Sequence, residues 1–115
     1  MSPLQIEAKE PDNGVIVVRL TGRLNAATSP EAKERLKALV RGGARGIVLD
    51  LSELSFIDSS GLAAIVAGYK AAIESGGALK IAAMAPQAAQ VFSLIHLDRV
   101  FEIYPDVGAA LHSFA

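Results

Sequence analysis

Hydrophobic and polar positions alternate near the start of the chain, which indicates two strands. Residues 4–9 alternate between apolar and polar side chains, as a half-exposed strand does, and residues 15–20 form a second, mostly apolar run. The turn signal Pro11-Asp12-Asn13-Gly14 separates the two runs. This pattern predicts an opening antiparallel hairpin, followed by a loop over residues 22–27.

Helical spacing first appears after this loop. Thr28 with Glu31 fits a capping box, and Ser29 followed by Pro30 fits an N-cap with proline at the first helical position. Both alternatives predict a helix that ends at Gly42-Gly43. Further strands are predicted at residues 46–51 with a continuation at 56–57, at 78–83 and at 100–104, and further helices after Asp58, from Pro86 and from Pro105-Asp106.

The order of these elements predicts an α/β fold with a mixed sheet and about four helices. An antiparallel hairpin opens the sheet, and parallel βαβ units follow it. Residues 46–51 are nearly all apolar, as expected of a strand covered on both faces. The predicted core contains Val17, Leu20, Leu36, Leu39, Val48, Leu49, Ile65, Val66, Ile81, Val91 and Phe92.

The junction at Asp58-Ser59-Ser60-Gly61 lies where a buried strand gives way to a helix. Apolar residues recur at helical spacing after it, in a stripe made of Leu62, Ile65, Val66, Tyr69 and Ile73. Asp58 or Ser59 is therefore predicted to cap the helix. The same position suits a phosphate, because free N–H groups and the positive end of the helix dipole point toward it. An ordinary N-cap and a phosphoacceptor serine both remain open at this point.

Composition narrows the class of protein. The chain has 115 residues, of which 51% are hydrophobic, and its net charge is −1. These values predict one domain over residues 1–115, neither disordered nor basic enough to bind nucleic acid. No run approaches the ~18 apolar residues of a membrane span, and the N-terminus does not resemble a signal peptide. We therefore expect a cytoplasmic protein without direct membrane insertion.

Catalytic machinery is not expected. His96 and His112 are the only histidines, and each is expected at a helix end or on the surface rather than beside a nucleophilic serine. The sequence contains no cysteine, no metal-binding motif and no phosphate-binding glycine loop before a helix. The prediction is a non-enzyme with no cofactor and no metal.

Five segments together resemble the STAS domain, the family named for sulfate transporters and anti-sigma factor antagonists. They are Leu20-Thr21-Gly22-Arg23-Leu24, Ile47 to Leu51, Phe56 to Leu62, Gly76-Gly77, and residues 85–97 with Ala85-Pro86, Val91-Phe92 and Leu97. The resemblance covers essentially the whole chain and is closest to stand-alone anti-sigma factor antagonists. It implies the STAS fold, a mixed sheet surrounded by helices.

The resemblance also implies a switch. In such antagonists the serine after the aspartate, here Ser59, is phosphorylated by a partner kinase that is itself the anti-sigma factor. The unphosphorylated form binds this kinase and releases a sigma factor, phosphorylation ends the binding, and a phosphatase restores it. The family usually has an acidic residue where this chain has Asn25, in Gly22-Arg23-Leu24-Asn25. That departure leaves the identity of the partner open.

A docking surface is expected around Ser59. Small side chains lie opposite the apolar stripe of the helix, although alanine is also simply the best helix former. The loop after residue 22 should lie close to Ser59, because both follow strand ends in one sheet. The predicted partner-binding residues are Asp58, Ser60, Gly61, Ala63, Ala64, Ala67, Arg23 and Asn25. The alternative function is a non-enzymatic scaffold or accessory subunit of a sensory assembly or membrane transport system.

Overall fold

A computed structural model describes residues 3–114 and shows a six-stranded mixed sheet over that range. The strand order is β1-β2-β3-β5-β6, and β4 pairs with β2 beyond the end of β3. Only β1 and β2 are antiparallel. The strands are β1 (Leu4–Asp12), β2 (Val15–Leu24), β3 (Gly46–Asp50), β4 (Leu54–Ile57), β5 (Ala78–Ala82) and β6 (Ile103–Tyr104).

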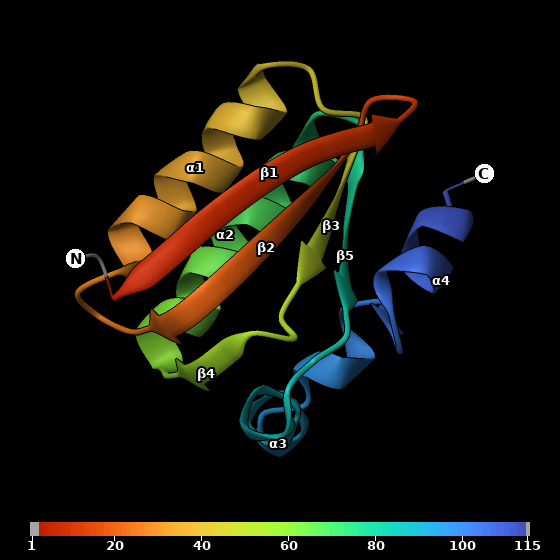
Figure 1. Cartoon of the computed structure of the whole chain (residues 1–115). Helices are drawn as coiled ribbons and strands as arrows, with labels where there is room; N and C mark the ends of the chain where they lie inside the picture. The colour runs from red at the N-terminus through yellow and green to blue at the C-terminus, as the bar shows by residue number, and fades with distance from the viewer. Residues whose placement is uncertain (1–2, 115) are drawn as a thin grey trace.

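Helices cover both faces of this sheet. They are α1 (Ser29–Arg41), α2 (Ser59–Glu74), α3 (Pro86–Leu94) and α4 (Val107–His112), and a 3₁₀ turn, η1 (Leu97–Arg99), follows α3. Figure 1 shows α1 and α2 side by side behind the sheet, α4 against the opposite face beside β3 and β5, and α3 below β4. The α/β class, the opening hairpin and the parallel units that follow are therefore confirmed.

Several strand boundaries differ from the prediction, and β1 continues to Asp12, into the expected turn. Residues 22–24, expected in a loop, belong to β2, because Gly22 adopts a φ of +111° and a register shift there lets the strand turn to pair with β4. The expected continuation at residues 56–57 is part of β4, separated from β3 by a turn. The last strand is shorter than 100–104, since η1 leaves Val100 52% exposed and β6 begins at Ile103.

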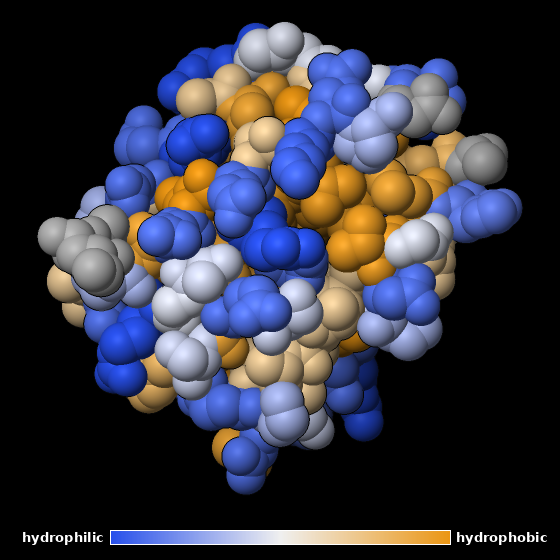
Figure 2. All heavy atoms as spheres, viewed as in Figure 1, coloured by the Kyte–Doolittle hydropathy of each residue, from blue (hydrophilic) through white to orange (hydrophobic). Residues whose placement is uncertain are grey.

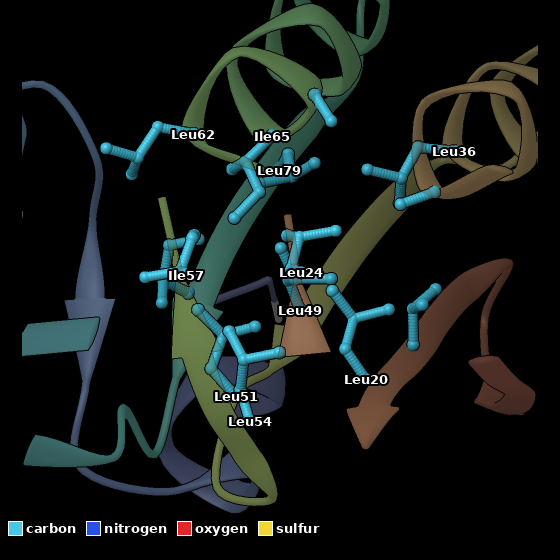
Figure 3. Packing of buried hydrophobic residues seen from close by; sticks show 14 of the residues in the cluster. Leu20, Leu24, Leu36, Leu49, Leu51, Leu54, Ile57, Leu62, Ile65 and Leu79 are labelled. Atoms are coloured by element: carbon cyan, nitrogen blue, oxygen red, sulfur yellow. The ribbon is translucent and has the colours of Figure 1, made fainter. Parts of the chain in front are cut away.

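The main core lies between the sheet and the pair α1 and α2, as the packed leucines and isoleucines in Figure 3 show. The prediction is confirmed for the fully buried members Leu20, Leu36, Val48, Leu49, Ile65, Ile81 and Phe92. A second, smaller core lies under α4 and consists of Val15, Val48, Ala82 and Ala110. The other four predicted members are only partly buried: Leu39, Val66 and Val91 pack against the main core, and Val17 packs against the second.

The buried side of α2 is rotated relative to the predicted stripe. Ile73, expected inside, is 50% exposed, whereas Ala64, expected outside, is 3% exposed. The cause is the close approach of α1: a Cβ on Gly68 would lie 2.7 Å from Leu36 Cδ1. Small residues on α2 thus form its contact with α1, and the larger apolar residues of the predicted stripe do not all face the core.

Candidate functional site

The pairing of β2 with β4 brings two distant segments to one edge of the sheet. Arg23 and Leu24 lie in register with Phe56 and Ile57. The backbone N–H of Asp58 then donates to Leu24 O at 3.2 Å. The expected proximity of the loop after β2 to the start of α2 is confirmed.

Asp58 caps α2, and Ser59 is the first residue of the helix. The Asp58 backbone is extended, with φ −119° and ψ −171°, and its Oδ1 accepts from Gly61 N at 3.0 Å. The Ser59 side chain is exposed, and its hydroxyl forms no hydrogen bond within residues 3–114. Ser60 is half-buried. Of the two possible caps, the structure selects Asp58 and leaves the Ser59 hydroxyl free.

Gly61 fixes how closely this helix approaches the sheet. A Cβ at this position would lie 2.6 Å from Leu24 O and 2.9 Å from Ile57 Cγ1. No side chain fits there, so α2 packs directly on the ends of β2 and β4. Gly61, predicted to contact a partner, is buried and holds Ser59 at the surface without being accessible itself.

Gln87, near the start of α3, holds the strand that leads into Asp58. Its Oε1 accepts from Ile57 N at 2.9 Å, and its Nε2 donates to Ile57 O at 3.1 Å. This side-chain amide pairs with β4 as a neighbouring strand would. Sequence analysis did not find this residue, because nothing local links position 87 to position 57.

Arg23 at the end of β2, and Asn25 just after it, also lie near the start of α2. The Arg23 guanidinium lies 4.4 Å from the centre of the Phe56 ring, over its face. Asn25 Oδ1 accepts from Ala27 N at 3.0 Å and from Thr28 N at 3.2 Å, which closes a tight turn before α1.

Thr28 completes this turn instead of forming a capping box. Its hydroxyl donates to Arg23 O at 2.8 Å and accepts from Asn25 N at 2.9 Å. Thr28 is the N-cap residue of α1, but its side chain makes no cap hydrogen bond. The predicted capping box with Glu31 is therefore wrong, because the hydroxyl is committed to the loop.

The accessible part of the small-residue surface is narrower than predicted. A shallow hollow lies between the starts of α1 and α2, lined by Ser29, Pro30, Lys33, Ser60, Ala63 and Ala64. Ala63 is exposed and Ala67 is half-buried. Ala64 was predicted to face a partner, but α1 packs over it. Another protein can reach Ser59, Ser60 and Ala63 on α2, and Ser29, Pro30 and Lys33 on α1.

The described residues give little support for histidine-based catalysis, metal binding or a membrane-spanning helix. His96 precedes η1 and His112 ends α4, and both are exposed. Residues 3–114 contain no group of three or more His, Cys, Asp or Glu side chains placed to hold a metal ion. Over the same residues, every helix is too short or too polar to cross a membrane.

The fold and this edge together define a small α/β domain that presents an exposed serine at the start of a helix. The chain belongs to the STAS domain family, whose match covers residues 5–110. It is 35% identical over 109 residues to a protein of Paenibacillus polymyxa named anti-sigma F factor antagonist, covering 94% of this chain and 92% of the relative.

Solved structures agree with this assignment. An anti-sigma factor antagonist from Mycobacterium paratuberculosis superposes with a TM-score of 0.86 at 27% identity, covering 96% of this chain and 92% of the other. The anti-sigma factor antagonist SpoIIAA in its unphosphorylated form gives a TM-score of 0.82 at 19% identity, with 96% of each chain covered. The latter likeness shows the STAS fold alone.

Proposed function

We propose that this chain is an anti-sigma factor antagonist that acts as a single, non-enzymatic STAS domain in the cytoplasm. In its unphosphorylated form it binds an anti-sigma factor that is a serine kinase, and a sigma factor is released. Phosphorylation of Ser59 by that kinase ends the binding, and a phosphoserine phosphatase restores it. The names of its relatives support the class of partner.

The observation that carries the proposal is the free, exposed hydroxyl of Ser59 at the start of α2. Asp58 supplies the cap, so the Ser59 oxygen is not needed for folding and is available to a kinase. The first turn also tolerates a phosphate, because its N–H groups and the helix dipole favour negative charge. A modification at this position leaves the fold intact.

The same phosphate opposes a close complex. It adds about 1.5–2 negative charges beside the Asp58 carboxylate and three strongly hydrated oxygens. A partner that covers Ser59 would have to remove water from this group and place its own atoms against it. Binding is lost through charge and desolvation at one point of the surface, with no rearrangement of the domain.

The test is phosphorylation by the purified anti-sigma factor kinase of the same organism with ATP, followed by mass spectrometry. We expect one phosphate, on Ser59, and none in Ser59→Ala. Ser60→Ala is the matched control and should be phosphorylated like the wild type. A phosphate on Ser60, or no phosphate at all, would contradict the proposal, and the latter would favour a scaffold without a switch.

A further inference from the structure

Two side chains near Ser59, those of Arg23 and Asn25, have hydrogen-bond donors that no described group of the chain occupies. We propose that the kinase surface docking here carries acceptors, with a carboxylate placed to meet Arg23 and the Asn25 side-chain nitrogen. This inference rests on the proposed function and adds the chemistry of the partner. Because Arg23 and Asn25 lie beside Asp58 at one edge of the sheet, a partner that covers Ser59 also meets the N–H groups of Arg23 and Asn25.

Arg23 is held in place and is electrically unpaired. Its guanidinium lies over the ring of Phe56, its cross-strand neighbour, and this contact restrains the side chain. The ion pairs formed among the side chains that the structure describes are Arg19–Asp50, Arg41–Glu34 and Lys80–Glu102, and Arg23 takes part in none of them. A planar, pre-positioned guanidinium with free N–H groups matches the two oxygens of a carboxylate and loses little freedom on binding it.

Asn25 offers a donor for a different reason. Two backbone N–H groups, of Ala27 and Thr28, point at one end of its amide, so that end is the oxygen. The oxygen is thus occupied inside the turn, and the nitrogen, Nδ2, forms no hydrogen bond within the part of the chain that the structure describes. No side-chain nitrogen or oxygen in that part is both buried and unpaired, so Nδ2 is reached from solvent.

The Asn25→Asp substitution distinguishes an acidic group on the partner from a basic one. An aspartate can accept from the same two N–H groups, so the turn is kept, while the outward nitrogen becomes a negatively charged oxygen. Against a carboxylate on the partner, the change must weaken binding. Against a basic group on the partner, it must strengthen binding.

The experiment measures, by calorimetry without ATP, the affinity of the purified Ser59 kinase for each variant. We expect Asn25→Asp and Arg23→Glu each to bind roughly tenfold or more weakly than the wild type. Arg41→Glu, which makes the same charge change as Arg23→Glu but at the far end of α1, is the control and should bind like the wild type. Thermal unfolding of each variant checks that the fold is unchanged.

The possible failures are distinguishable. If wild-type protein does not bind the kinase, the proposed function is wrong and this inference falls with it. If the wild type binds and Asn25→Asp binds equally well or more tightly, the proposed function stands and the acceptor surface is wrong. Equal weakening by Arg41→Glu would show a diffuse charge effect and would also overturn the inference.

Discussion

At the scale of single residues, the adjacent polar residues Asp58 and Ser59 at the start of α2 differ in what their side chains bind. Asp58 accepts from Gly61 N and stabilises the first turn of α2, while Ser59 makes no such bond. Under the proposed function, phosphorylation of Ser59 leaves the cap bond of Asp58 in place.

The cap therefore predicts different costs for two neighbouring substitutions. Asp58→Ala should lower the free energy of unfolding by ~1 kcal/mol, because it removes the acceptor for Gly61 N. Asp58→Asn should retain most of this stability, since an amide oxygen can accept the same bond. Ser59→Ala should leave the free energy of unfolding almost unchanged. All three variants are to be measured by urea denaturation. A cost for Ser59→Ala as large as that of Asp58→Ala would show that the cap is misassigned.

At this scale the sequence predicted where the helix begins but left open which residue caps it. The motif located the junction and reduced the cap to Asp58 or Ser59, but cap choice depends on backbone angles that neighbouring strands impose. The burial of Ala64 was missed for a related reason. Helical periodicity says which residues share a face, whereas the distance to α1, set by Gly68 and Leu36, decides which face is covered.

At the scale of elements, β4 is a four-residue strand held from both sides. On one side it pairs with the end of β2, and on the other the amide of Gln87 substitutes for a neighbouring strand. The sequence predicted β2, β3 and α3 as elements but could not predict this bridge, which joins positions 30 residues apart. Because β4 runs directly into Asp58, its anchoring sets where Ser59 lies.

Removing the bridge should loosen this strand locally. Gln87→Met keeps the length of the side chain but leaves Ile57 N and Ile57 O unpaired, so we expect a loss of ~1–3 kcal/mol in the free energy of unfolding. Amide hydrogen exchange at Ile57 should accelerate more than exchange in β3. Gln90→Met, on an exposed position of the same helix, is the control and should change neither. Unchanged exchange at Ile57 in Gln87→Met would show that β2 alone holds β4.

At the scale of the whole molecule, the buried cores lie on the faces of the sheet and the candidate binding surface lies at its edge. The helices α1 and α2 bury the main core on one face, α4 covers part of the other, and the edge with Ser59 and Arg23 stays open. Figure 2 shows apolar residues mixed with polar ones across one face. Under the proposed function, recognition at this edge requires only that a few side chains be presented rigidly, which suits the proposed switch by one phosphate.

The central claim is that a phosphate on Ser59 ends partner binding without changing the fold. Calorimetry should compare the affinity of the kinase, without ATP, for the unphosphorylated chain and for the same chain phosphorylated on Ser59. We expect the phosphorylated form to bind at least about tenfold more weakly. Phosphorylation should change amide chemical shifts in NMR spectra only at the residues around Ser59. Equal or tighter binding of the phosphorylated form, or shifts spread through β3 and β5, would contradict the account.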